Sequence, residues 1–114
     1  MVEIVRGSSV KIESTVYVDE GVTPANLTLA YITFIVKKRS LDSDTSALYT
    51  KVIGSGLSVV SETAGTINVF LTPTDTNYSD SFLFWELIVT LSDGTVIRNG
   101  VNKFRLVGNV KIAL

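Results

Sequence analysis

The fold of this chain is decided by the ten-residue stretch FLFWELIVTL at residues 82–91. Its side chains alternate between two faces with the period of two of a β-strand, and residues that favour strands dominate it. One face carries Leu83, Trp85, Leu87, Val89 and Leu91, and the other carries Phe82, Phe84, Glu86, Ile88 and Thr90. Because both faces are largely apolar, we expect this stretch to be the central strand, with the Trp85 face turned toward the core.

Shorter runs of the same character surround the central stretch. Residues 10–18 alternate apolar and polar side chains more regularly than any other segment, and Asp93-Gly94 is a strong signal for a hairpin leading out of residues 82–91. Further strands are predicted at residues 31–36, 48–53, 57–60, 66–72, from 96 onward and at 104–107. About eight short strands without helical periodicity predict an all-β fold, a two-sheet immunoglobulin-like β-sandwich of about 7–9 antiparallel strands in a single domain, residues 1–114.

The composition limits the partners. The 114 residues are 46% hydrophobic and only 18% charged, against roughly 25% charged in typical soluble domains, so we expect part of the surface to face another subunit. The net charge is -1, and no basic cluster is longer than Lys37-Lys38-Arg39, which excludes a nucleic-acid partner. No apolar run approaches the roughly 18 residues of a membrane span, and the amino terminus lacks the pattern of a signal peptide. We therefore expect no membrane partner and synthesis in the cytoplasm.

The residues that most often carry catalysis are missing. The chain contains no His and no Cys, which removes the usual triads and zinc sites. Asp42 and Asp44 flank Ser43 in a polar segment, but the glycine and distal glutamate of a calcium loop are absent, so a solvated acidic loop is expected. The order of the remaining carboxylates does not suggest a glycosidase pair. We expect no enzymatic activity, no cofactor, no metal and no small-molecule substrate.

The second face of the central strand is the candidate interface. Phe82, Phe84 and Ile88 lie on it, and Tyr31 and Ile35 occupy the corresponding face of the neighbouring run. If no other element covers these side chains, they form an apolar strip for a partner. The alternative is that both faces are buried within the domain.

Glu86 shares that face, in the most apolar part of the sequence. A carboxylate at such a position is either exposed or paired, because an unpaired buried charge is costly. Of a solvent-exposed Glu86 and a functional acid, the sequence favours the exposed side chain.

The turns and strands follow a recognisable order. The matching elements are Arg6-Gly7-Ser8, Asp19-Glu20-Gly21, Asn26-Leu27-Thr28 before residues 32–37, Gly56-Leu57, Gly65 with residues 72–76, and Phe84-Trp85-Glu86-Leu87 before Asp93-Gly94 and Gly100. This order resembles the immunoglobulin-like domain of bacteriophage virion proteins, best known as the amino-terminal domain of the baseplate upper protein in tailed phages. The resemblance covers nearly the whole chain and contains no catalytic signature.

The resemblance implies a connector or docking module of a tail, baseplate or head, located in the virion and bound to other virion proteins or to further copies of itself. The chain has no coiled-coil extension or receptor-binding attachment, so a small decoration subunit is an equal expectation. The alternative function is a carbohydrate-binding sandwich, in which Tyr31, Tyr49 and Tyr78 would stack on sugar rings. Genes for capsid or tail proteins beside the coding sequence would favour the first hypothesis.

Overall fold

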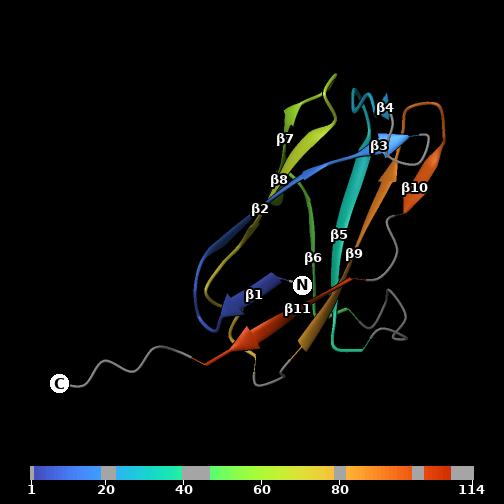
Figure 1. The fold of residues 1–114 in the computed structure, drawn as a ribbon. Helices are drawn as coiled ribbons and strands as arrows, with labels where there is room; N and C mark the ends of the chain where they lie inside the picture. The colour runs from blue at the N-terminus through green and yellow to red at the C-terminus, as the bar shows by residue number, and fades with distance from the viewer. Residues whose placement is uncertain (1, 19–22, 40–46, 79–81, 99–101, 109–114) are drawn as a thin grey trace.

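The computed structural model describes residues 2–18, 23–39, 47–78, 82–98 and 102–108, in which β-strands and turns are the regular structure and no helix occurs (Figure 1). Its main sheet has nine strands, and eight of them follow one another in the order β1 (Val2–Val5), β11 (Asn102–Val107), β9 (Phe82–Thr90), β5 (Tyr31–Lys37), β6 (Tyr49–Ile53), β7 (Gly56–Ser61), β8 (Thr66–Leu71) and β2 (Val10–Thr15). β10 (Val96–Arg98) also pairs with β9, and β3 (Tyr17–Val18) and β4 (Thr23–Pro24) form a separate small sheet. The prediction of an all-β fold is confirmed.

The main sheet nearly closes on itself. β1 and β2 lie at opposite ends of the strand order, yet only residues 6–9 connect them along the chain. A connection of this length spans at most about 18 Å when fully extended, at about 3.6 Å per residue. The two ends of the sheet are therefore held close together, and the sheet curls into two facing halves, β1-β11-β9-β5-β6 and β7-β8-β2.

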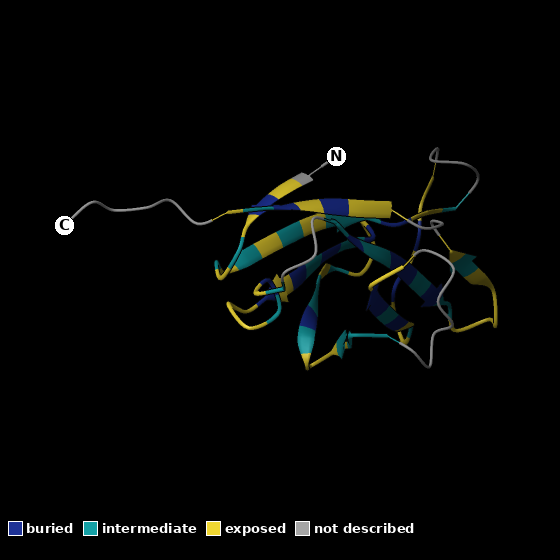
Figure 2. Cartoon of the chain, turned by 90° about the horizontal axis from the view of Figure 1, so that it is seen from below, coloured by how far each residue is buried: buried dark blue, intermediate teal, exposed yellow. Residues whose placement is uncertain are grey.

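The core fills the space between these halves. The largest fully buried apolar side chains come from both of them: Ile32, Phe34, Val36, Leu83, Val89 and Phe104 from the first, and Leu57, Ile67, Val69 and Leu71 from the second. Figure 2 shows buried positions alternating with more exposed ones along the strands, as the period of two requires. Burial of this apolar surface is the main force that holds the two halves together.

The structure differs from the predicted sandwich in strand number, in pairing and in the division into sheets. Eleven strands occur among the described residues, and β1–β11 and β6–β7 pair in parallel. The two halves belong to one hydrogen-bonded sheet, because Val52 and Ile53 of β6 pair with Gly56 and Leu57 of β7. An immunoglobulin-like sandwich of two sheets is thus not confirmed. The predicted strand at residues 10–18 is divided into β2 and β3, and the strands that were not predicted, β1 and β4, have four and two residues, too few to produce a visible alternation.

Candidate functional site

The two faces of β9 have the orientation that the alternation predicts. Leu83, Leu87 and Val89 are buried in the core, and Val89 and Leu87 lie opposite Ile32 and Phe34 of β5. Trp85 is partly buried, and its ring stacks on that of Phe34 with 5.2 Å between the centroids. The prediction that this face packs against the core is confirmed.

The five predicted interface residues share the opposite face of β5 and β9. We call it the outer face, and its members are Tyr31, Thr33, Ile35 and Lys37 of β5 and Phe82, Phe84, Glu86, Ile88 and Thr90 of β9. The strand register brings them together, since Thr33 lies opposite Ile88 and Lys37 lies opposite Phe84. The pairing of two distant segments thus produces one continuous surface.

The outer face is open to different degrees along its length. Tyr31 is 65% exposed, whereas Ile35 is only 5% exposed and offers almost no contact area. Phe82, Phe84 and Ile88 are partly buried. The apolar area that a partner can reach is therefore concentrated at the two ends of the face, around Tyr31 and around the two phenylalanines.

Glu86 lies at the middle of this face and is buried. Only 6% of the residue is exposed, so the predicted exposure is wrong. The alternative of pairing is the one found: Arg98 Nη2 donates to Glu86 Oε1 at 2.7 Å, and Arg98 Nε donates to Oε2 at 3.3 Å. This bidentate geometry compensates the buried carboxylate, while the Arg98 side chain remains half exposed.

Arg98 was not predicted as the partner of Glu86, although the sequence contains a signal for this pair. The Asp93-Gly94 hairpin forms as predicted, with hydrogen bonds between Leu91 and Thr95 and from Gly94 N to Leu91 O. Pairing outward from this turn brings Arg98 opposite Ile88, one diagonal step from Glu86. Counting residues outward from the Asp93-Gly94 turn along both strands would therefore have predicted that Arg98 and Glu86 lie close together.

Cations border the phenylalanine end of the outer face. Lys103 and Arg105 of β11 lie opposite Phe84 and Phe82 respectively. The Lys103 ammonium stands 4.8 Å from the centre of the Phe82 ring, which is a cation–π distance. Arg105 is in turn paired with Glu3, at 3.5 Å between Arg105 Nη1 and Glu3 Oε1. This end thus combines two aromatic rings with a charged rim.

A second polar cluster joins β6 to the loop after β8. Lys51 Nζ lies 2.6 Å from Asp75 Oδ2, and both side chains are largely buried, at 14% and 13% exposed. Thr72 N also donates to Asp75 Oδ2 at 2.8 Å. Burial alone would raise the pKa of the Asp75 carboxyl, but the hydrogen bonds from Lys51 and Thr72 outweigh it and hold this pKa below its ordinary value. The cluster is therefore an ion pair that fastens the loop to the sheet.

Two of the three candidate sugar-stacking tyrosines belong to this second cluster. The Tyr49 and Tyr78 rings stack on each other with 6.3 Å between centroids, and the Lys51 ammonium stands 5.4 Å from the Tyr49 ring. The Tyr49 hydroxyl is buried without a hydrogen-bond partner, and burial followed by the charge of Asp75 raises its pKa. Because the Tyr49 and Tyr78 rings stack on each other, Tyr31 is the exposed member of the predicted set of sugar-stacking tyrosines.

The described residues contain no group of three or more acidic side chains that could hold a metal ion. The predicted acidic loop with Asp42 and Asp44 lies outside the described residues. No helix in the described part of the chain is long and apolar enough to cross a membrane. Comparisons of the sequence with protein-family models and with curated proteins find no match in either case.

Proposed function

We propose that this chain is a non-enzymatic structural protein of a bacteriophage particle, a connector or docking module of the tail, baseplate or head that acts by binding other virion proteins. The observation that carries the proposal is the construction of the outer face. Aromatic side chains lie beside cations at its phenylalanine end, and a buried ion pair holds its centre rigid. Aromatic residues are enriched in protein interfaces, and charged side chains commonly form their rims.

The order of the strands supports an immunoglobulin-like origin for the domain. In such folds the first sheet contains strands B, E and D, and the second contains C, F and G. Here the chain order and pairing give β2-β8-β7 for the first set and β5-β9-β11 for the second, with β6 in the place of an added strand beside β5. The β6–β7 pairing then joins what would otherwise be two separate sheets. This correspondence fits the resemblance to phage immunoglobulin-like domains.

The buried carboxylates support a structural rather than a catalytic role. Glu86 is neutralised by Arg98 and Asp75 by Lys51, in each case from a neighbouring element. A general acid or base needs a pKa close to the working pH, and the pKa of Asp75 moves away from neutrality. The alternative of a carbohydrate-binding module has less support, because Tyr49 and Tyr78 stack on each other instead of facing outward.

The first experiment tests the location of the protein. Particles from the source phage or an induced prophage are purified on a density gradient and analysed by mass spectrometry. The chain should sediment with the particles at a constant ratio to the major virion proteins. A chain that stays at the top of the gradient while complete particles form would overturn the proposal.

The second experiment tests the outer face. Phe84→Asp introduces a charge that a partner would have to desolvate, at a cost of about 2 kcal/mol or more in binding. The variant should fold and yet be missing from particles. Val60→Asp is the matched control, because Val60 is an exposed apolar residue of β7 on the other half of the sheet. An unfolded Phe84→Asp protein would show instead that Phe84 belongs to the core of its own domain.

A further inference from the structure

β2 is a free edge of the main sheet. Among the described strands it pairs with β8 alone, in an unbroken antiparallel register from Val10 opposite Leu71 to Thr15 opposite Thr66. Natural proteins protect such edges with proline, a bulge or a charge that points inward, because an open edge pairs readily with another strand. β2 has no proline, bulge or inward charge over its six residues, and its only charged side chains are Lys11 and Glu13, which form an exposed pair of opposite sign. The other edge strand, β1, is shorter, with four residues.

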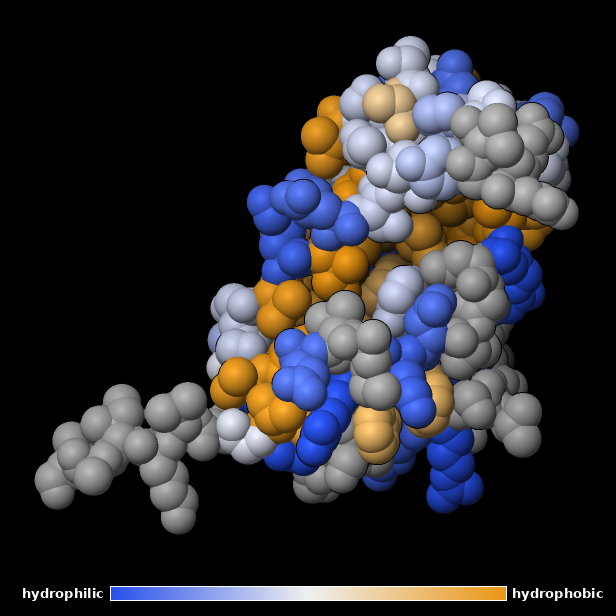
Figure 3. Space-filling view, viewed as in Figure 1, coloured by the Kyte–Doolittle hydropathy of each residue, from blue (hydrophilic) through white to orange (hydrophobic). Residues whose placement is uncertain are grey.

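The inward row of β2 leaves apolar area beside the open edge. Val10 and Ile12 pack against the core but remain partly exposed. Figure 3 shows apolar surface next to hydrophilic side chains over the part of the molecule where β2 and β8 run. An added strand would cover this area and satisfy the backbone groups that β2 turns away from β8.

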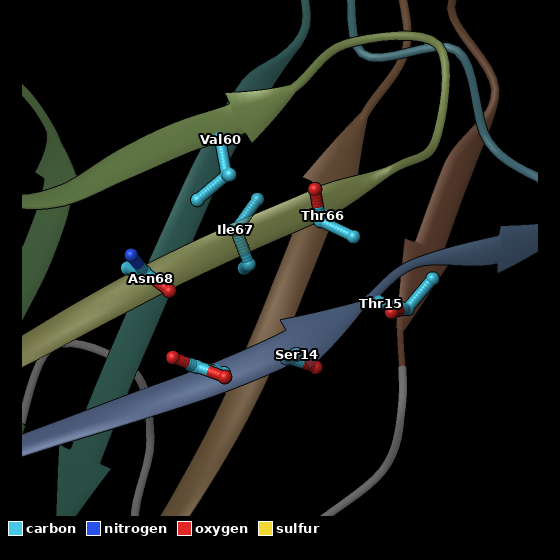
Figure 4. Close-up of a pocket in the computed structure, with 7 residues that line it drawn as sticks. Ser14, Thr15, Val60, Thr66, Ile67 and Asn68 are labelled. Atoms are coloured by element: carbon cyan, nitrogen blue, oxygen red, sulfur yellow. The ribbon is translucent and has the colours of Figure 1, made fainter.

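The outward row of β2 carries one charge of each sign. Lys11 Nζ lies 3.0 Å from Glu13 Oε1, and both side chains are more than half exposed. The pair cancels the charge that would otherwise discourage a second strand. Beside Glu13, a hollow of about 350 Å³ opens between β2, β8 and β7, and Figure 4 shows Asn68 and Val60 at its side. The hollow lies over β8, between β2 and β7, and so stands one strand in from the open edge.

We propose that two copies of this chain pair antiparallel through β2, about a two-fold axis that passes at Ile12. In this register Lys11 of each copy lies opposite Glu13 of the second copy. A shift of two residues would place Lys11 opposite Lys11 or Glu13 opposite Glu13, and a shift of one would exchange the inward and outward rows. The charges therefore select the register with Ile12 at the centre. Because pairing about a two-fold axis is closed, it stops at the dimer and does not continue into a fibre.

This inference deepens the proposed function and rests on it in assuming that the chain works by assembly. It assigns self-association to the β2 edge and leaves the outer face for a different partner. The two surfaces lie on opposite halves of the curled sheet, so each can be altered without touching the other.

The test is the mass of the full chain in solution, measured by light scattering and sedimentation over a range of concentrations. The wild-type chain should approach twice its 12.4 kDa. Lys11→Glu and Glu13→Lys should each weaken the dimer at least about tenfold, because each turns both cross-strand pairs into like charges. The two variants should dimerise with each other when mixed, and the double variant K11E/E13K should dimerise alone. All four proteins should fold with the same circular dichroism spectrum, since both positions are exposed, and the dimeric ones should melt at a somewhat higher temperature because association stabilises the folded state.

Matched controls separate the two proposals. Lys103→Glu reverses a charge on the strand beside the outer face and should leave the dimer intact. A wild-type chain that stays monomeric at every concentration overturns β2 pairing, even if the chain is found in particles. A dimer that withstands both single charge reversals, or that Phe84→Asp abolishes instead, overturns it as well. Loss of the chain from particles with an intact dimer counts only against the virion role.

Discussion

Gly65→Ala is the substitution whose effect on stability can be worked out most directly. Gly65 lies between β7 and β8 at φ +68°, and a Cβ atom there would stand 2.6 Å from Val16 O and 2.9 Å from Ala25 O. Both neighbours are backbone atoms that cannot rotate away. They are also fixed by hydrogen bonds, because Val16 N donates to Gly65 O and Ala25 N donates to Val16 O, each at 2.8 Å. The glycine is thus the place where the small β3–β4 sheet meets the main sheet.

Two costs combine in the variant. A side chain at positive φ costs about 1 kcal/mol, and forcing packed atoms apart costs about 1–3 kcal/mol, so the free energy of unfolding should fall by about 2–4 kcal/mol. Gly94→Ala is the control: its φ is +91°, but no atom lies within 4 Å of the added Cβ. The free energy of unfolding of Gly94→Ala should therefore fall only by the cost of a side chain at positive φ, about 1 kcal/mol.

Urea denaturation provides the measurement, since the single tryptophan, Trp85, reports on core packing by its fluorescence. Equal losses for Gly65→Ala and Gly94→Ala would refute the close approach of the β3–β4 segment. A change in the slope of the transition would instead show that two-state unfolding no longer holds.

Three further predictions use urea denaturation, followed by far-UV circular dichroism for Trp85→Ala because that variant lacks the fluorescent reporter. Trp85→Ala should lower the free energy of unfolding by about 3 kcal/mol through the loss of its ring stack, and a midpoint equal to wild type would contradict the core assignment. Asp75→Asn should cost about 1–3 kcal/mol at neutral pH. Because the folded-state pKa of Asp75 lies below its ordinary 3.8, the ion pair with Lys51 stabilises the protein above that pH and is lost as the pH falls through the folded value. The variant should therefore lose less stability in acid than wild type, and parallel acid curves would argue against the pair. Arg98→Ala should cost about 1–3 kcal/mol by leaving Glu86 without its partner, and the double variant R98A/E86Q should recover part of that loss.

The parts of the fold that could be predicted are those that a local pattern determines. Alternation alone identified residues 82–91 as a strand and placed Trp85 on its core face, because each strand residue points to the side opposite its neighbours. The Asp93-Gly94 turn likewise follows from local backbone geometry. These features need no knowledge of the rest of the chain.

The parts that could not be predicted depend on contacts between distant segments. Ile35 and Tyr31 have the same position in the alternation of β5, yet Ile35 is buried and Tyr31 is exposed. The difference in exposure depends on which distant segments pack against each side chain, and the alternation carries no information about those segments. The sequence predicts an ordinary turn at Gly54-Ser55-Gly56. In the structure this turn keeps β6 and β7 hydrogen-bonded and so joins the two halves into one sheet. Which strands become neighbours is decided by packing of the whole chain.

The two proposed surfaces have a joint consequence for assembly. The β2 edge belongs to one half of the curled sheet and the outer face to the other, so a dimer joined through β2 would leave both outer faces uncovered. A two-fold dimer then presents two identical docking faces, and a partner with two matching sites would bind with the added advantage of effective concentration. Single charge reversals at Lys11 or Glu13 should therefore weaken incorporation into particles even though the outer face is intact. The K11E/E13K double variant, which restores the complementary charges, should restore incorporation as well. Normal incorporation of the monomeric single variants would show that each copy docks independently of its twin.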